Sequence, residues 1–420
     1  MEMERRGYSV AFTANYDFQD TNRYNPKVVI SPAIYRDGQL ITDLEKYGLK
    51  KKVANLLWEQ LIGVKQEEMP HGAHNIIGTG QKVVTFCWGK RTQDRLASDG
   101  MPRDKAIVVG QINTDLLRGS FKDTLLDKVT IAKQFKINEN ARWNLFISSF
   151  SYCELDELQK KGISAAVGQK HLEDFTRISI ESRKALLSWF EEVLQRYTDD
   201  IIIYRPHPDE ARKSVVLKDL EKKYNNFRVI GDLALKHWIN SSDKVYNWFS
   251  TGIIDGLVLD KPIRIVRPCP IPIEYDYRLF HSAKHIKSMD EFKEDYSSLE
   301  KEEVFDPDML SEYYYIPNGF VYQEICDVLE DMLKSDKYDI HYSLKERLYF
   351  GSKRCIYLLS NNLSFIKPLL RKLNLFKDTF AKSDIARKAL EAGYAKNVAT
   401  DEEINELYSR LKPIVYGEQI

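Results

Sequence analysis

The sequence predicts an α/β protein with two parallel sheets. Short β-rich runs alternate with amphipathic helical patterns along most of the 420 residues. Strand–helix alternation at this spacing is typical of parallel sheets with helices on both faces. The length also fits, because domains usually contain ~100–200 residues, so two domains and an appendage are expected.

The first half of the chain is expected to form one sheet. Residues 1–8 are interpreted as the end of a first helix that enters the next strand. Leu56, Leu57 and Leu61 recur at helical spacing in the middle of this half. The expected strands are 7–13, 27–31, 82–87 and 106–110, and the expected helices are 44–62 and 91–98.

A polar, charged stretch at 121–140 marks the predicted boundary, after which a second set of strands begins. We therefore predict an N-terminal Rossmann-like domain at 1–135, a second at 136–335, and a helical extension at 336–420. The expected strands of the second sheet are 143–148, 200–204, 227–231, 244–248 and 262–266, and the expected helices are 180–197 and 251–259.

The composition is that of an ordinary soluble globular protein, with 43% hydrophobic and 30% charged residues. Lys+Arg and Asp+Glu balance at 62 each, so net charge indicates no partner. Outside the C-terminal region no basic stripe with a known motif indicates nucleic-acid binding. Five scattered cysteines without a CxxC pair predict neither zinc nor a disulfide framework. Without a signal-peptide core or an apolar run of ~18 residues, a cytoplasmic location is expected.

Residues 343–382 differ from the rest of the chain. They carry nine Lys/Arg against two acidic residues, interleaved with Leu, Ile, Phe and Tyr. One interpretation is an amphipathic element that rests on an anionic membrane, here the inner face of the cell membrane. The alternative is a helix that packs on the protein and leaves a basic face in solvent.

The first motif that carries chemistry is Tyr204-Arg-Pro-His-Pro-Asp-Glu210, at the carboxyl end of an expected buried strand. Ligands of open α/β sheets bind at such ends. The prolines stiffen the turn, so His207 is ordered in advance. Imidazole can donate to a phosphate oxygen or act as an acid, and the Arg205 fork suits phosphate. The alternative is a proline-bounded turn whose histidine caps local carbonyls.

The second motif is Trp248-Phe-Ser-Thr-Gly-Ile-Ile-Asp-Gly256, which follows a strand and opens a helix. Ser250, Thr251 and Gly252 are expected at the helix start, where free N–H groups favour an anion. A plain N-cap is the alternative. With the His-Pro segment upstream, the motif predicts a phosphate cradle.

The third motif is Glu67-Glu-Met-Pro-His-Gly-Ala-His74. Its HxxH spacing is a weak metal pattern, because Pro70 and Gly72 indicate a loop, and no metal is expected. A catalytic base, His71 or Glu68, is one interpretation. A polar loop without function is the other.

Taken in order, these segments resemble the bacterial surface-carbohydrate biosynthesis enzymes of GT-B architecture. The likeness extends from about residue 63 to residue 266. The sequence is similar in outline to capsule Kdo and sialic acid transferases, which hold CMP, and to CDP-glycerol glycerophosphotransferases of teichoic acid synthesis. The segments that carry it are His71-Gly72, Trp88-Gly89, 109–115, 205–208, 250–252, Gly256 and Lys261-Pro262.

The resemblance implies two Rossmann-like domains that face each other across a cleft. It places Arg205 and His207 on the donor phosphate, and His71 at the acceptor. The implied donor-binding residues are Ser148, Ser149, Arg205, His207, Pro208, Glu210, Ser250, Thr251 and Gly252.

The expected function is transfer of a sugar from a nucleotide-activated donor, with a CMP-linked 2-keto sugar such as Kdo or a nonulosonic acid as the first choice. The expected acceptor is a bacterial surface polysaccharide or a lipid-linked glycan, and no metal or cofactor is expected. The alternatives are a UDP- or GDP-hexose transferase, a CDP-polyol phosphotransferase, and a non-catalytic scaffold of a polysaccharide assembly complex.

Overall fold

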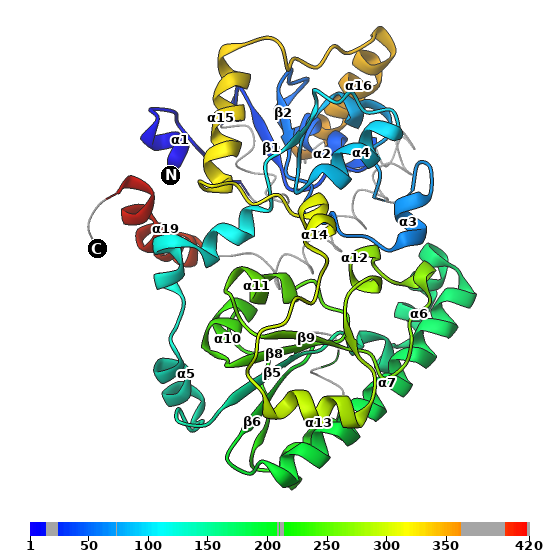
Figure 1. Ribbon diagram of the computed structural model, residues 1–420. Coiled ribbons are helices and arrows are strands. Elements are labelled where there is room, and N and C mark those ends of the chain that lie inside the picture. The colour runs from blue at the N-terminus through cyan, green and yellow to red at the C-terminus, as the bar shows by residue number, and fades with distance from the viewer. Residues whose placement is uncertain (14–23, 73, 208–209, 211–213, 363–399, 418–420) are drawn as a thin grey trace. The chain divides into compact units, whose positions relative to one another are not determined.

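The computed structural model describes residues 1–13, 24–72, 74–207, 210, 214–362 and 400–417. They form two compact units (Figure 1). Unit 1 comprises Met1–Gln60, Met69–Ile112 and Tyr314–Ile420, and unit 2 comprises Leu61–Glu68 and Asn113–Tyr313. The sequence had suggested boundaries near residues 135 and 335. Each unit contains one parallel sheet, so the predicted fold class with two Rossmann-like sheets is confirmed.

The sheet of unit 1 has four parallel strands in the order β1-β2-β3-β4. All are short, and the two central strands β2 and β3 are fully buried, as expected for parallel strands covered on both faces. The strands are β1 (Val29–Ser31), β2 (Val53–Asn55), β3 (Val84–Cys87) and β4 (Ala106–Val108). The helices are α1 (Glu2–Arg5), α2 (Asp37–Tyr47), α4 (Lys90–Ser98), α15 (Val321–Lys334), α16 (Leu344–Asn362) and α19 (Asp401–Tyr416).

Helix α15 comes from far along the chain, yet it supplies part of the core of unit 1. Its buried residues recur at helical spacing and belong to the same hydrophobic cluster as Val84 and Phe86 of β3. These residues of α15 are Val321, Ile325, Leu329 and Met332. Figure 1 shows α15 among the elements of unit 1. Unit 1 therefore cannot bury its sheet without the C-terminal part of the chain.

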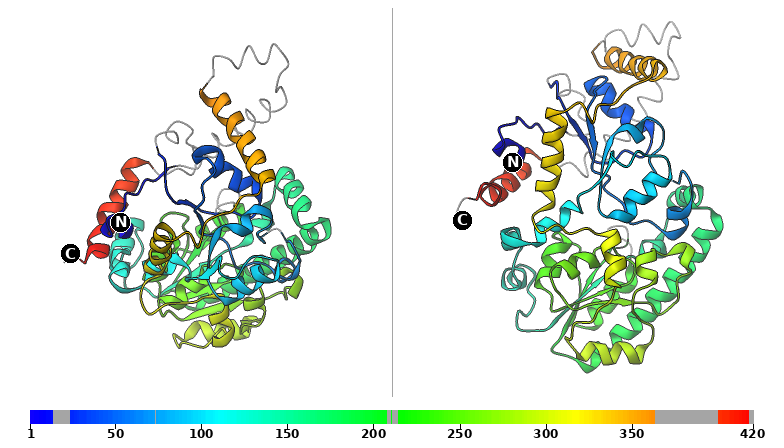
Figure 2. Two further views of the ribbon diagram at one scale, coloured as in Figure 1. Left: turned by 90° about the horizontal axis from the view of Figure 1, so that it is seen from above. Right: turned by 45° about the horizontal axis from the view of Figure 1, so that its top comes forward.

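The helical C-terminal region is present in unit 1. Helix α16 lies beside α2 (Figure 2), where the Arg354 guanidinium donates to the carbonyls of Glu45 and Lys46. Helices α1 and α19 lie side by side, joined by a 2.8 Å hydrogen bond from the Tyr408 hydroxyl to Glu4. Of the basic stretch 343–382, residues 363–382 lie outside the described residues.

Unit 2 is built on six parallel strands in the order β7-β6-β5-β8-β9-β10. The first strand in sequence, β5, is central, and the chain moves outward from it first on one side and then on the other. This is the doubly wound Rossmann order. The strands are β5 (Trp143–Ile147), β6 (Ile201–Arg205), β7 (Phe227–Val229), β8 (Lys244–Asn247), β9 (Ile263–Val266) and β10 (His285–Ile286).

The crossover connections of this sheet are mostly helical, as parallel strands require. The helices of unit 2 are α3 (Val64–Glu68), α5 (Lys128–Phe135), α6 (Glu157–Val167), α7 (Gln169–Arg196), α9 (Val215–Lys223), α10 (Leu235–Ser241), α11 (Ile253–Val258), α12 (Arg278–His281), α13 (Met289–Ser297) and α14 (Pro307–Tyr313).

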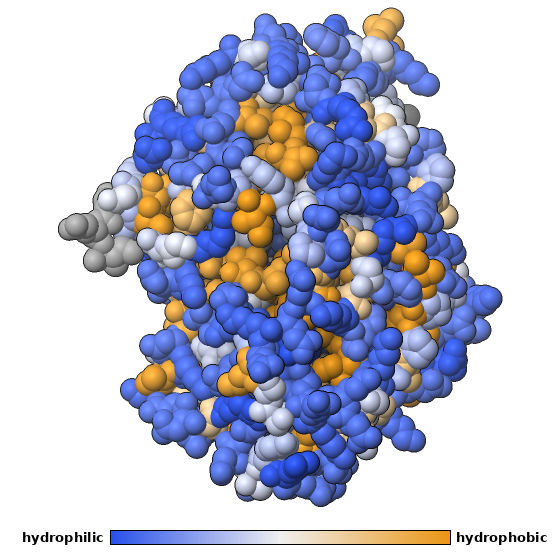
Figure 3. Space-filling view, viewed as in Figure 1, coloured by the Kyte–Doolittle hydropathy of each residue, from blue (hydrophilic) through white to orange (hydrophobic). Residues whose placement is uncertain are grey.

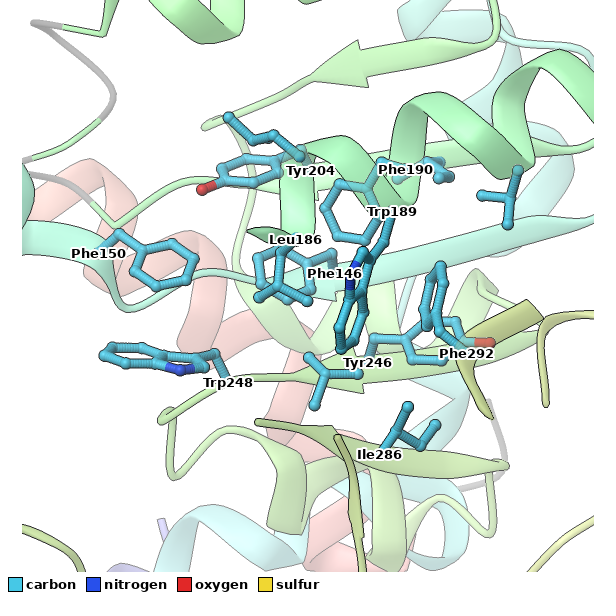
Figure 4. Packing of buried hydrophobic residues seen from close by; sticks show 14 of the residues in the cluster. Phe146, Phe150, Leu186, Trp189, Phe190, Tyr204, Tyr246, Trp248, Ile286 and Phe292 are labelled. Atoms are coloured by element: carbon cyan, nitrogen blue, oxygen red, sulfur yellow. The ribbon is translucent and has the colours of Figure 1, made fainter. Parts of the chain in front are cut away.

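An aromatic core fills the space between the sheet of unit 2 and helices α7 and α13 (Figure 4). Phe146 of β5 meets Phe190 of α7 edge-on, with ring centroids 5.1 Å apart. At the carboxyl end of the sheet, Phe150 stacks on Trp248 with centroids 4.4 Å apart. Such pairs add about 0.5–1.5 kcal/mol beyond burial. This stack links the turn after β5 to the turn after β8.

Two predictions about unit 1 are wrong. The strand expected at 7–13 does not form, and Val10 and Phe12 are 38% and 74% exposed. Among the described strands β1 pairs only with β2, so these residues have no strand partner there. The expected helix 44–62 is instead the end of α2 followed by β2. Helix α2 ends at Tyr47 and is capped by Gly48, whose φ of 84° suits glycine. A three-residue buried strand has no periodicity that distinguishes it from a helix.

None of the described helices is long and apolar enough to cross a membrane. The face of the molecule in Figure 3 is mostly hydrophilic, with apolar residues in scattered groups. The basic stretch begins on α16, where Leu344 and Leu348 are 74% and 67% exposed. Its contact with a membrane stays a prediction.

Candidate functional site

The strand order of unit 2 reverses between β5 and β8. Ligands of open α/β sheets bind outside the carboxyl strand ends at such a switch point. The described residues that follow the neighbouring strands β5, β6 and β8 are 148–150, 206–207 with Glu210, and 248–252. Two of the three sequence motifs therefore meet at one edge of one sheet.

The strand register places these segments close together. Ile147 of β5 pairs with Arg205 on one side and with Asn247 on the other. Neighbouring strands are about 4.8 Å apart, so the backbones of Arg205 and Asn247 are separated by roughly 10 Å. One phosphorylated ligand can span that distance.

The turn that carries His207 is held in place by the buried carboxyl group of Glu210. Glu210 is fully buried, and the Ser148 hydroxyl donates to its Oε2 at 2.5 Å. The Tyr204 hydroxyl lies 2.6 Å from Glu210 Oε1 and 3.0 Å from Ser148 Oγ. The backbone N–H of His207 donates to Glu210 Oε2 at 3.4 Å, and the Glu210 N–H donates to the His207 carbonyl at 2.9 Å. Ser148 and Glu210 thus fix the turn.

Burial raises the pKa of the Glu210 carboxyl, although hydrogen bonds from Ser148 and Tyr204 oppose the shift. Burial also raises the pKa of the Tyr204 hydroxyl well above its usual value. The Arg183 guanidinium lies 3.7 Å from Glu210 and donates to Glu154 at 2.8 Å. These neighbours stabilise a carboxyl group that has no access to solvent.

The turn after β8 is fixed by side chain–backbone hydrogen bonds. The Ser250 N–H donates to Asn247 Oδ1 at 2.8 Å, and the Gly252 N–H donates to Ser250 Oγ at 3.2 Å. Thr251 is exposed, and Ser250 is partly buried. Helix α11 begins at Ile253, two residues later than expected, so all three predicted residues lie in the turn before it.

Gly252 allows this turn to approach β5. A Cβ atom at this position would lie 2.5 Å from Leu235 Cδ2 and 3.8 Å from Ile147 Cδ1. The first distance is too short for any side chain without a shift of Leu235. The glycine therefore brings the turn next to the carboxyl end of the central strand.

Arg205 is engaged with the neighbouring loop. Its guanidinium donates to the carbonyls of Ile230, Asp232 and Leu233 through both terminal nitrogens. Burial lowers the pKa of this guanidinium. The phosphate contact expected of Arg205 stays a prediction, as does the donor-binding role of Ser149. Pro208 lies outside the described residues.

In unit 1, His71 is 67% exposed, and its Nδ1 lies 3.2 Å from Asp99 Oδ1. His71 adopts a left-handed backbone conformation with φ of 53°, which is uncommon for a residue other than glycine. Such conformations persist where surrounding contacts impose them. The geometry leaves Nε2 on the side of the ring opposite the carboxylate.

Glu68, the other candidate base, lies on α3 in unit 2 and forms an ion pair with Arg278. The side chain of its neighbour Glu67 is 4% exposed and lies 3.4 Å from Arg278 and 3.1 Å from the Tyr313 hydroxyl. The two candidate bases thus belong to different units.

Sequence reasoning missed Arg183, Asn247 and a buried pair after β9. That pair is Arg267 and Asp276, whose side chains are 2% and 1% exposed and lie 3.1 Å apart. The role of Asn247 could have been predicted, because an Asn side chain at the start of a turn commonly accepts a hydrogen bond from a backbone N–H of that turn. The signal for Arg183 was its position close to the apolar face of α7. A charged side chain that is buried there needs a partner of opposite charge.

No protein-family model matches the chain, and no curated protein matches it. Among the described residues, no group of three or more His, Cys, Asp or Glu side chains could hold a metal ion.

Solved structures give distant similarity. UDP-GlcNAc 2-epimerase from Methanocaldococcus jannaschii aligns with a TM-score of 0.48 and 14% identity over 74% of this chain and 79% of that one. UDP-GlcNAc 2-epimerase from Neisseria meningitidis bound to UDP-GlcNAc aligns with a TM-score of 0.45 and 16% identity, over 76% of this chain and 79% of that one. A variant of the wall teichoic acid polymerase TagF aligns with a TM-score of 0.43 and 11% identity, over 73% of each chain. At these values the similarity carries no argument about activity.

Proposed function

We propose that the protein is a nucleotide-sugar-dependent glycosyltransferase of GT-B type. Its donor is a nucleotide-activated sugar, with a CMP-linked 2-keto sugar such as Kdo or a nonulosonic acid as the first choice. Its acceptor is a bacterial surface polysaccharide or a lipid-linked glycan. The observation that carries the proposal is the position of the His207 and Ser250–Gly252 turns on either side of β5, at the switch point of the sheet of unit 2.

The chemistry of this edge suits the departing nucleotide. Cleavage of a glycosyl–phosphate bond leaves negative charge on the phosphate. His207 and the hydroxyl groups of Ser250 and Thr251 donate to that phosphate, and donors fixed in advance stabilise the charge as it develops. In this proposal Ser148 and Glu210 do not contact the donor but hold the His207 turn in place.

Replacement of His207 tests the phosphate role. His207→Ala is expected to lower turnover at least about 100-fold, because a preset donor to the developing charge is lost. The circular dichroism spectrum and melting temperature are expected to stay unchanged, because Glu210 holds the turn through the backbone of residue 207. His341→Ala, an exposed histidine of unit 1, is the control. Near-normal turnover in His207→Ala would remove the phosphate role.

A screen of nucleotides separates the alternatives. A ligand at about 100 times its Kd stabilises the native state by roughly 2.7 kcal/mol and so raises the melting temperature. Since the first-choice donor is CMP-linked, we expect CMP to raise the melting temperature of the full chain more than CDP, UDP or GDP. Transfer assays with the corresponding activated sugars and CDP-polyols then identify the reaction. A response to UDP or GDP alone favours a hexose transferase. No response to any nucleotide favours a scaffold without catalysis.

A further inference from the structure

The loop between β7 and α10 of unit 2 is held by the side chain of Arg205. The guanidinium of Arg205, at the carboxyl end of β6, donates to the carbonyls of Ile230, Asp232 and Leu233. The Asp232 carbonyl also accepts the indole N–H of Trp238 at 2.9 Å. One side chain therefore gathers three carbonyl groups of the loop and determines where the loop lies.

The course of this loop requires a residue in an unfavourable conformation. Leu233 has φ of 62°, in the left-handed region, which disfavours a residue with a Cβ atom by a factor of about 5 to 30. Such conformations persist where surrounding contacts impose them. The hydrogen bonds from Arg205 are contacts of that kind, so loss of the guanidinium should let the loop leave this conformation.

The loop in turn supports the Ser250–Gly252 turn. Leu235 is the first residue of α10 and lies two positions after Leu233. It is so close to Gly252 that a Cβ atom on the glycine would be 2.5 Å from Leu235 Cδ2. Leu235 therefore packs directly against the turn whose hydroxyl groups are the proposed phosphate donors. A shift of the loop would remove this support.

We infer that Arg205 is a positioning residue that acts on the donor through the loop and Leu235, not through a contact of its own with the phosphate. The inference rests on the proposed function. The guanidinium holds Leu233 in the left-handed conformation, so the Ser250–Gly252 turn is in place before the donor binds. Without the guanidinium this arrangement is a minor state, and the apparent affinity for a nucleotide falls in proportion to its population.

The indole N–H of Trp238 reports on the loop and needs no ligand. Nitrogen-15 correlation spectra of the full chain contain the signals of six tryptophan indoles, and Trp238→Phe identifies the one from Trp238. We expect Arg205→Ala to shift or broaden this signal, because the Asp232 carbonyl that it contacts moves with the loop. In a Leu233→Gly background the same substitution should move it much less, because glycine adopts positive φ readily. An unchanged signal in Arg205→Ala overturns the inference.

Affinity for a nucleotide separates the positioning role from a direct contact. In titrations with CMP, Arg205→Ala is expected to raise the Kd about 5- to 30-fold, the factor by which leucine disfavours the loop conformation. In the Leu233→Gly background the same substitution should raise it by no more than about 3-fold. A guanidinium that contacts the phosphate would lose the same factor in both backgrounds, so an equal loss overturns the inference.

Leu233→Asn repeats the comparison if the glycine variant does not fold. Asparagine keeps a side chain and still tolerates the left-handed region, so the effect of Arg205→Ala on the Kd should again be reduced. An undiminished effect in this background also overturns the inference.

Arg228→Ala is the matched control. Arg228 likewise donates to the carbonyl of a residue with positive φ, Lys136, at 3.4 Å, and to that of Phe135 at 3.3 Å. That segment enters β5 at the edge of the sheet opposite the proposed site, so the Kd for CMP should change by less than about 2-fold. If the wild type binds none of CMP, CDP, UDP and GDP, the proposed function fails, while the Trp238 signal still decides whether Arg205 holds the loop.

Discussion

At the scale of single residues, the carboxyl group of Glu210 determines how the His207 turn is held. It joins the hydroxyl groups of Ser148, directly after β5, and Tyr204 of β6 to the backbone of the turn, with no exposure to solvent. Buried polar groups of this kind are costly to leave without partners, and a network in which each member is satisfied fixes one geometry.

Removal of this carboxyl group should destabilise unit 2. Glu210→Ala leaves the hydroxyls of Ser148 and Tyr204 without their acceptor, and we expect the free energy of unfolding to fall by roughly 2–4 kcal/mol. Urea denaturation measures this. Glu157→Ala, on the 91% exposed side chain of Glu157, should change it by less than about 0.5 kcal/mol. An equally small effect at Glu210 would contradict the role of the network.

The sequence was sufficient to place residues at the edge but not to predict their partners. Ser148 and His207 follow strands whose buried apolar runs were recognisable, so their position could be predicted. Their hydrogen bonds depend on Glu210, and those of Arg205 depend on the loop after β7. Periodicity indicates which face a residue occupies, but it does not indicate the direction of a hydrogen bond.

At the scale of elements, the short strand β10 completes the sheet of unit 2 and begins with a partly buried histidine. The ring of His285 is 2.8 Å from the Phe280 carbonyl in α12. Burial lowers the pKa of His285 from 6.5 to about 4. The connection between α12 and β10 therefore favours a neutral imidazole.

This shift predicts a loss of stability in acid. Between pH 6.5 and about 4 the unfolded chain binds a proton at His285 that the folded chain does not. The free energy of unfolding therefore falls as the pH falls through this window, by at most on the order of 3 kcal/mol. His285→Gln should show a weaker pH dependence there in urea titrations. Above the window the two proteins should vary with pH in parallel, and parallel curves within it would refute the assignment.

Elements could be predicted where an apolar run lies beside turn residues. The five strands expected in the second half correspond to β5 to β9, because each is an apolar run beside turn residues. The two-residue strand β10 was missed because it is too short to show a pattern. Strand β2 was missed because Leu56, Leu57 and Leu61, which follow it, recur at helical spacing.

At the scale of the whole molecule, neither unit is one continuous segment. Unit 1 uses the start and the end of the chain, and α15 contributes four buried side chains to its core. At about 1.5–3 kcal/mol each, their burial is worth roughly 6–12 kcal/mol. That equals the total stability of an ordinary domain.

A fragment of residues 1–135 should therefore not fold. We expect it to show little cooperative unfolding by circular dichroism and rapid proteolysis, because the sheet of unit 1 is uncovered without α15. Co-expression with residues 314–420 should restore protection to β3 and β4. A stable, protease-resistant 1–135 fragment would show that α15 is dispensable.

The division into two sheets was predictable, because strand–helix alternation is interrupted by a polar stretch. The membership of the units was not, since α15 reads as an ordinary amphipathic helix and nothing in its pattern names the sheet that it covers. The segment Leu61–Glu68 lies between two stretches of unit 1 in the sequence but belongs to unit 2. Its backbone pairs with unit 2, since Gly63 and Val64 contact the backbone at residues 276 and 277.

The late position of α15 in the chain sets an order for biogenesis. The ribosome completes every residue of unit 2 before it reaches residue 321, so the second sheet can form while the first still lacks its cover. At about 5–20 residues per second, the gap between the synthesis of β4 and that of α15 lasts some ten seconds or more. During that time the apolar strands near the N-terminus are natural clients for a nascent-chain chaperone.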